Sequence, residues 1–131
     1  MINNNIAVLI PCYNEESTIL SVVNDFKNTL PEAVVYVYDN ASTDNTSKVA
    51  KSAGAIVRAE TKKGKGNVVS RMFADIEADV YIMVDGDNTY EASKCPEMIN
   101  QLINENLDMV VATRITDNNG GEYRWGHVFG N

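Results

Sequence analysis

Asp85 and Asp87 are the side chains whose type and spacing most directly suggest chemistry in this chain. They follow the apolar run Val80–Val84 and are separated only by Gly86. Alternate residues of a strand lie on the same face about 7 Å apart. We expect Gly86 to let the backbone bend here, because glycine adopts angles that other residues avoid. The two carboxylates would then converge.

Converging carboxylates repel each other unless a cation lies between them, and Mg²⁺ and Mn²⁺ prefer such oxygen ligands. Mg²⁺ usually keeps several waters and binds one or two carboxylates together with substrate phosphates. The segment therefore predicts a site for a metal-bound phosphate compound. The alternative is a solvated turn, since aspartate and glycine both favour turns.

Positive charge gathers a short distance upstream of these aspartates. The basic residues there are Arg58, Lys62, Lys63, Lys65 and Arg71. The formal net charge of the whole chain is −7, which argues against general nucleic-acid binding. The local basic run is compatible with an anionic substrate or with a solvated surface.

The length of 131 residues fits one domain with a real core. No apolar run approaches the roughly 20 residues of a membrane helix, and the first residues lack the features of a secretion signal. Cys12 and Cys95 have no metal-ligand spacing, and two isolated thiols fit a reducing cytoplasm. His127 is the only histidine, so a histidine-based metal site is excluded, and we expect it on the surface or in a loop.

Short β-branched runs alternate with amphipathic helical patterns. The predicted strands are Ile6–Pro11, Val34–Asp39, Ala55–Ala59, Val80–Asp85 and Met109–Thr113. The helices predicted from apolar residues at 3–4 spacing lie within Ile19–Leu30, Val49–Ala53, Val68–Ile76 and Met98–Ile103. Gly54 is expected to end the second helix and Pro96 to lie in the first turn of the fourth. The alternation indicates an α/β fold with three layers, α/β/α, around a mostly parallel sheet.

In such sheets, ligands bind beyond the carboxyl ends of the strands, where the strand order reverses. Polar segments follow the first, second and fourth predicted strands, and they are Pro11–Glu16, Asp39–Asp44 and Asp85–Asp87. We expect them to lie together at one edge of the sheet. Asn14 and Asn40 are expected to shape turns, and Glu16 to cap the first helix.

These three segments, in this order, resemble the motifs of family 2 glycosyltransferases. Those enzymes have the GT-A fold, a Rossmann-like nucleotide-binding α/β domain with a metal-bound DxD motif. The resemblance extends from about Ile6 to Arg124. Gly64-Lys65-Gly66 and Thr113-Arg114 are further similar to the branch that glycosylates polyprenyl phosphates, such as dolichol-phosphate mannose synthases.

The resemblance implies a glycosyltransferase, of the hexosyltransferase type, with a site for a UDP- or GDP-sugar. It implies that Pro11, Tyr13 and Glu15 border the nucleoside pocket. It also implies that Asp39 accepts hydrogen bonds from the base or the ribose.

By the same resemblance, Asp85 faces the sugar or ribose, and Asp87 ligates Mg²⁺ or Mn²⁺ under the diphosphate. Lys65, Arg114 and Arg124 are then expected near phosphate groups of the donor or acceptor. The implied catalytic residues are Asp85, Asp87 and Arg114.

Sugar transfer has chemical requirements that agree with these roles. The departing nucleoside diphosphate gains negative charge, which a metal neutralises as a Lewis acid. Inverting transfer needs a nucleophile on the opposite face of the sugar, and a hydroxyl acceptor also needs a general base. A phosphate monoester is already anionic, since its second pKa is near 6. A polyprenyl phosphate is therefore a candidate acceptor, and we expect a cytoplasmic protein, or one peripheral to the inner face of the membrane.

Enzymes of this family are usually longer than 131 residues. We therefore expect residues 1–131 to be a single nucleotide-sugar-binding domain, the N-terminal part of a GT-A domain. The acceptor site and any catalytic base would follow Asn131. A non-catalytic sugar-nucleotide-binding domain is the alternative.

Two other enzyme classes match parts of the same sequence. The segment Asp85–Thr89 fits the DxDxT signature of HAD-type phosphatases, whose first aspartate becomes phosphorylated. That motif normally ends the first strand of its fold, and no later acidic pair follows it here. Gly64-Lys65-Gly66 is a weaker match to a dinucleotide-binding loop, because it lacks the third glycine of that motif and does not lie in the first βα turn.

Overall fold

A computed structural model of the chain describes residues 5–88, 91–111, 115–116, 122–123 and 127–130. Its strands are β1 (Ile6–Cys12), β2 (Val34–Asp39), β3 (Ile56–Ala59), β4 (Val80–Met83), β5 (Met109–Val111), β6 (Ile115–Thr116), β7 (Glu122–Tyr123) and β8 (His127–Gly130). Its helices are α1 (Ile19–Thr29), α2 (Thr46–Ser52), α3 (Lys65–Asp75) and α4 (Cys95–Asn104), with the 3-10 helix η1 (Ala92–Lys94). Among the described helices, none is long and apolar enough to cross a membrane.

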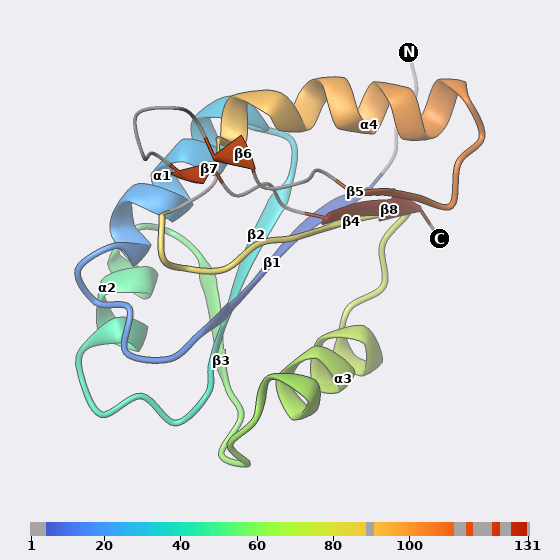
Figure 1. The fold of residues 1–131 in the computed structure, drawn as a ribbon. Coiled ribbons are helices and arrows are strands. Elements are labelled where there is room, and N and C mark those ends of the chain that lie inside the picture. The colour runs from blue at the N-terminus through green and yellow to red at the C-terminus, as the bar shows by residue number, and fades with distance from the viewer. Residues whose placement is uncertain (1–4, 89–90, 112–114, 117–121, 124–126, 131) are drawn as a thin grey trace.

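The main sheet has six strands in the order β3-β2-β1-β4-β8-β5 (Figure 1). β1 lies parallel to β2 and β4, and β3 lies parallel to β2. The strand order reverses at β1, because β2 and β4 lie on its two sides. β8 is antiparallel to both β4 and β5, and β6 pairs with β7 in a separate sheet of two strands. The predicted α/β architecture around a mostly parallel sheet is confirmed.

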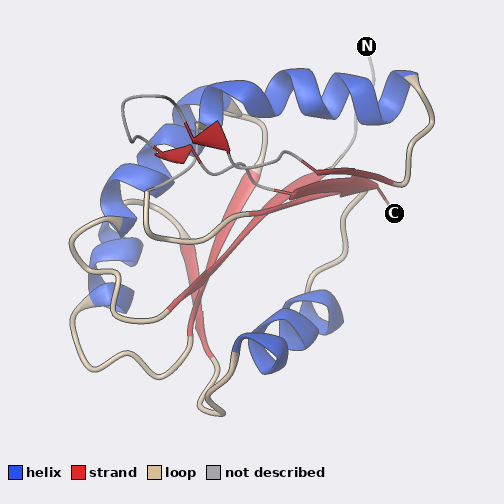
Figure 2. Cartoon of the chain, in the orientation of Figure 1, coloured by secondary structure: helices blue, strands red, loops and turns tan. Residues whose placement is uncertain are grey.

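Helices cover both faces of the sheet (Figure 2). One face packs against α1, α2 and α4 in a core that includes Val8, Ile10, Val37 and Phe26. The other face packs against α3 in a smaller core that contains Leu9 and Tyr38. Successive side chains of a strand point to opposite faces, so each central strand contributes to both cores.

Most predicted element boundaries agree with the structure to within one or two residues. Gly54 follows α2 with φ +94°, which suits the glycine predicted to end that helix, and Pro96 lies in the first turn of α4. β4 ends at Met83, before the predicted Asp85, so both aspartates lie in the loop that follows. His127 begins β8 rather than lying in a loop, because β8 fills the antiparallel position between β4 and β5.

Gly86 is required for a reason other than the predicted backbone angle. Only Gly54 and Gly64 are glycines with positive φ among the described residues. A Cβ at position 86 would lie 2.6 Å from Cys12 Sγ and 3.4 Å from Ile19 Cδ1. Gly86 therefore lets the loop after β4 pack directly against the end of β1.

Two members of the basic run belong to an ion-pair network between the β3 region and α3. Arg71 Nη1 contacts Glu60 Oε2 at 2.9 Å, and Arg71 Nε donates to Asp75 Oδ2 at 3.1 Å. Arg58 lies 3.7 Å from the same carboxylate. The buried Tyr38 hydroxyl also donates to Asp75 Oδ2 at 2.8 Å. Burial, followed by this bond and the charge of Asp75, raises the pKa of Tyr38 to about 12.

Tyr38→Phe is expected to lower the free energy of unfolding at pH 8 by about 1 kcal/mol, the usual net value of a hydrogen bond. An unfolded tyrosine ionises near pH 10, whereas the folded Tyr38 ionises near pH 12. The stabilisation from the neutral phenol is therefore complete below pH 10 and is lost as the pH rises toward 12. Urea unfolding at several pH values is expected to show the difference between the two proteins shrinking over this interval. A constant difference from pH 8 to 12 would contradict the prediction.

Gly86→Ala is expected to lower the free energy of unfolding by about 1–3 kcal/mol, as overpacking does. In a Cys12→Ala background the sulfur is absent, so the same change should cost at least about 0.5 kcal/mol less. The matched control is Gly66→Ala in α3, where an added Cβ meets nothing within 4 Å and the helix gains stability. Equal effects at positions 86 and 66 in urea unfolding would argue against the close approach.

Candidate functional site

A cavity of about 600 Å³ lies at the carboxyl ends of β1, β2 and β4, the edge predicted from the sequence. The described residues that line it are Pro11, Cys12, Tyr13, Glu15, Asn40, Lys63, Gly64, Lys65, Val68, Asp85 and Asp87. The set contains most of the predicted site residues. Arg114 and Arg124, and the Thr113 beside Arg114, lie outside the described residues.

Glu15, Asp85 and Asp87 contribute carboxylates to the lining of the cavity. Burial raises the pKa of Glu15, and the negative charges of Asp87 and Asp85 raise it further. The Thr18 hydroxyl partly offsets this effect by hydrogen bonding to the carboxylate. The three acidic groups are thus close enough to repel one another.

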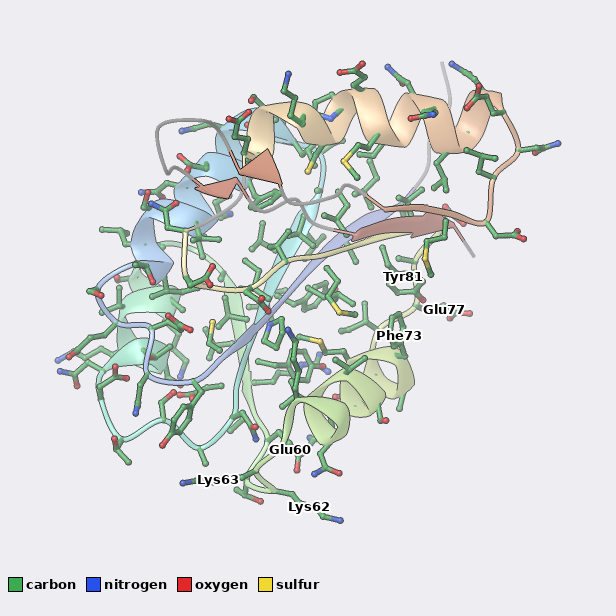
Figure 3. The ribbon with its side chains drawn as sticks, in the orientation of Figure 1. Glu60, Lys62, Lys63, Phe73, Glu77 and Tyr81 are labelled. Atoms are coloured by element: carbon green, nitrogen blue, oxygen red, sulfur yellow. The ribbon has the colours of Figure 1, made fainter. Side chains whose placement is uncertain are left out.

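Lys65 provides positive charge next to one of these groups. Its Nζ lies 2.6 Å from Asp85 Oδ1, and its side chain remains largely exposed. Lys63 lies beside it, with Nζ 5.3 Å from the centre of the Tyr13 ring, a cation–π distance. Figure 3 shows Lys63 with Glu60 and Lys62 on the segment that leads into α3. Lys63 was not singled out for the site from the sequence, although its position next to Gly64-Lys65 is a usable signal.

The carboxylate oxygens at this site are suitable ligands for a hard divalent cation. Asp87 offers carboxylate oxygens, with Asp85 and Glu15 close by. Among the described residues, no group of three His, Cys, Asp or Glu side chains is arranged to hold a metal ion. An ion bound through Asp87 would therefore complete its shell with water and substrate oxygens, as Mg²⁺ commonly does.

Asp39 has a different environment from the cavity carboxylates. It is buried and is not among the lining residues. Its Oδ1 accepts a hydrogen bond from the Ser42 amide at 2.9 Å, and its Oδ2 accepts one from the Ser47 hydroxyl. In this structure, Asp39 stabilises the turn that leads into α2 through these two hydrogen bonds. Its contact with a nucleotide stays a prediction.

The loops after β1 and β2 are tied to each other by hydrogen bonds. Asn14, at φ +52°, accepts one from the Thr43 amide at 2.8 Å, so its predicted turn role is confirmed. Glu15 N donates to Thr46 Oγ1 at 2.9 Å. Glu16 does not cap α1, because its Oε2 accepts the Asn45 N–H at 3.2 Å at the start of α2. These bonds fix the backbone that carries Tyr13 and Glu15 into the cavity.

The loop after β4 is held against α1 by a residue that the sequence did not reveal. Thr18 Oγ1 donates to the Gly86 carbonyl at 2.6 Å. Gly86 also packs closely against Cys12, which is buried and whose thiol pKa is raised by burial and by nearby carboxylates. Asp85 and Asp87 are therefore attached to a fixed loop. The signal for Thr18 was hidden, because a threonine before a helix ordinarily indicates only a cap.

Several known proteins have sequences similar to this chain. The profile of "Glycosyl transferase family 2" matches residues 7–129. Protein RfbJ of Shigella flexneri is 58% identical over 123 residues, which cover 94% of this chain and 95% of that protein. Glycosyltransferase AglJ of Haloferax volcanii is 39% identical over 86% of this chain, and the match covers 37% of AglJ. The dolichyl-phosphate hexose transferase of the same organism is 31% identical over 86% of this chain and 49% of its own length. The chain thus spans nearly all of RfbJ and half or less of the other two.

Solved structures agree with the fold. Glucosyl-3-phosphoglycerate synthase of Mycobacterium tuberculosis has a TM-score of 0.73 at 26% identity, over 82% of this chain and 44% of the enzyme. Its complex with Mn²⁺, UDP and phosphoglyceric acid has a TM-score of 0.74 at 25% identity, over 83% of this chain and 43% of the enzyme. The likeness confirms the GT-A fold. Together with the profile match over residues 7–129, it shows that the chain belongs to glycosyl transferase family 2.

Proposed function

We propose that the chain is the nucleotide-sugar-binding domain of an inverting, metal-dependent glycosyltransferase. The observation that carries the proposal is that Asp85 and Asp87 line the same cavity as Tyr13 and Lys65. This cavity lies where the strand order reverses, the usual ligand position in open α/β sheets. Membership of the family favours this interpretation over a HAD-type phosphatase.

The charges of the cavity suit a nucleoside diphosphate that arrives with a cation. Glu15, Asp85 and Asp87 alone would repel a diphosphate, whereas Lys63 and Lys65 attract it. A Mg²⁺ or Mn²⁺ ion on Asp87 would offset the carboxylates and, as a Lewis acid, would stabilise the departing diphosphate. The complexes of the mycobacterial enzyme with Mg²⁺ or Mn²⁺ and UDP support this view.

The remaining lining residues suit the other parts of a UDP- or GDP-sugar. Pro11 and Tyr13 offer apolar and aromatic surface to the nucleoside, with Glu15 beside them. Asp85, held by Lys65 and the Gly86 loop, faces the sugar or the ribose. We infer that Asp39 also accepts a hydrogen bond from the base or ribose, through lone pairs that Ser42 and Ser47 do not use.

We propose that the acceptor is a phosphate monoester, with a polyprenyl phosphate as the specific candidate. Such an acceptor needs cations rather than a general base, since it is already anionic at neutral pH. Support comes from Gly64-Lys65-Gly66 and from the similarity to a dolichyl-phosphate hexose transferase. Arg114 and Arg124 are the proposed phosphate contacts. The corresponding location is the cytoplasm at the inner face of the membrane, and the free, buried Cys12 and Cys95 fit that compartment.

Asp87→Asn is expected to weaken the Mn²⁺-dependent binding of UDP or GDP by at least about tenfold, since loss of even an outer-shell partner costs 10–100-fold in metal affinity. Calorimetric titration with each nucleotide, with and without Mn²⁺, measures the effect. The matched control is Asp108→Asn, which removes the same charge from an exposed position before β5. Binding that ignores Mn²⁺ in the wild type, or equal losses in both variants, would remove the metal assignment.

Sugar transfer itself separates the enzyme from a non-catalytic binding domain. When joined to the C-terminal half of a longer relative such as AglJ, the chain is expected to transfer hexose from the nucleotide sugar that it binds to a polyprenyl phosphate in detergent, with inversion at the anomeric carbon. Chromatography of a radiolabelled product and NMR of its anomeric proton measure the two properties. Nucleotide binding without transfer to any phosphate acceptor would instead favour the binding-domain alternative.

A further inference from the structure

Asn40 makes a set of contacts that its predicted turn role does not explain. It follows β2, is 8% exposed and lies in the wall of the cavity. Its Nδ2 donates to the carbonyls of Glu60 and Lys62, both at 2.9 Å. Its Oδ1 accepts the Gly64 amide at 2.9 Å. One side chain thus binds three backbone groups of the segment Glu60–Gly64.

The match between these groups and an amide is specific. A primary amide offers two N–H donors and a carbonyl acceptor in one plane. Aspartate has the same shape but no donor, so it would oppose two carbonyls with negative charge. Leucine has neither donor nor acceptor, and serine is shorter. Asparagine is therefore the side chain that fits this position.

The segment bound by Asn40 carries the cations of the cavity. Lys63 lies over the ring of Tyr13, and Lys65 contacts Asp85. Between them, Gly64 adopts φ +129°, a conformation that side-chain-bearing residues rarely occupy. The bond from Asn40 holds the amide of this same glycine. Asn40 therefore binds backbone groups on both sides of Lys63 and immediately before Lys65.

The backbone of Asn40 fixes the other end of this connection. Its N–H donates to the Cys12 carbonyl at 2.8 Å, so Asn40 is attached to the end of β1. Glu60 N also donates to Asp39 O at 2.9 Å, which brings the segment beside the end of β2. Asn40 thus connects the β1 end, the β2 end and the start of α3.

We propose that Asn40 is a positioning residue that sets how Lys63 and Lys65 reach into the cavity and so determines its affinity for the diphosphate group of the donor. The proposal rests on the proposed function, since it assigns the diphosphate to these lysines. Residues 62–65 are exposed, so water can replace the lost hydrogen bonds when Asn40 is shortened. Loss of Asn40 therefore loosens the segment more than it destabilises the core.

The first test measures the segment without any ligand. Amide hydrogen exchange followed by NMR is expected to show Gly64 and its neighbours exchanging about tenfold faster or more in Asn40→Ala, as in a locally opened segment. Amides of β1 and the middle of β2 should keep their wild-type rates. Asn24→Ala, an exposed change on α1, serves as the control. Unchanged exchange at Gly64 in Asn40→Ala would overturn the proposal.

The second test asks whether Asn40 acts through the lysines. Four proteins are compared: the wild type, Asn40→Ala, the double variant Lys63→Met/Lys65→Met, and the triple variant that combines all three changes. Each is titrated with UDP, GDP and inorganic pyrophosphate in the presence of Mn²⁺. Asn40→Ala is expected to weaken binding about tenfold with the lysines present and less than about twofold without them, as for coupled sites. Equal losses in both backgrounds would overturn the proposal, since a merely structural role needs no lysines. Asn40→Ser replaces Asn40→Ala if the latter does not fold.

The two tests distinguish a failure of the proposed function from a failure of the positioning role of Asn40. If the wild type binds neither nucleotide nor pyrophosphate, the proposed function and the diphosphate assignment both fail. The exchange rates still decide whether Asn40 holds the segment. If the wild type binds normally but the lysine variants and Asn40→Ala act independently, only the positioning role fails.

Discussion

The parallel pairing of β1 with β2 on one side and β4 on the other determines the geometry of the cavity. β1 and β2 stay in register to their ends, with Cys12 opposite Asp39. β4 stops earlier, with its last residue Met83 opposite Leu9. The end of β1 therefore extends past β4, and the loop with Asp85 and Asp87 turns alongside it. The cavity lies at this staggered edge.

The staggered edge brings opposite charges together in a confined space. Repulsion among Glu15, Asp85 and Asp87 favours any arrangement that puts a cation among them. In this structure, the Lys65 ammonium group lies against Asp85 and offsets part of the repulsion. The same carboxylates that a donor's diphosphate would avoid become favourable once a divalent ion is bound. Acidic and basic side chains in one cavity are thus consistent with a substrate that binds as a metal complex.

The sequence was sufficient to predict the parallel part of the sheet and the edge at which the cavity lies, but not the antiparallel strand β8. Near-continuous apolar strands linked by helical patterns define a parallel sheet, and the carboxyl ends of parallel strands meet at one edge. Three polar loops after three such strands therefore had to be neighbours. Pro11, Tyr13, Glu15, Asp85 and Asp87 lie in these loops, and all five line the cavity. Lys65, which also lines it, was expected there only from the family resemblance.

Features that depend on distances between separate segments were not predictable. The need for Gly86 comes from Cys12, more than 70 residues earlier in the chain, rather than from its own backbone angle. The position of His127 comes from antiparallel pairing with β4 and β5, which no local pattern reports. Glu16 was expected to cap the first helix, whereas its partner lies in another loop, and Thr18 drew no expectation although it bonds to the Gly86 carbonyl. In each case the partner is remote in sequence, so composition and spacing carry no signal of it.

The different environments of Asp39 and Asn40 follow from the alternation of side chains along β2. Val35 and Val37 face the core under α1 and α2, whereas Tyr36 and Tyr38 face α3. Continuing this alternation past the end of the strand directs Asp39 toward α2, where it binds Ser47, and Asn40 toward the segment before α3. The same rule sends Cys12 toward α1, against Gly86, and Asp85 toward Lys65. The adjacent residues Asp39 and Asn40 therefore make different contacts in this structure. Asp39 binds the turn before α2, and Asn40 binds the segment that carries Lys63 and Lys65.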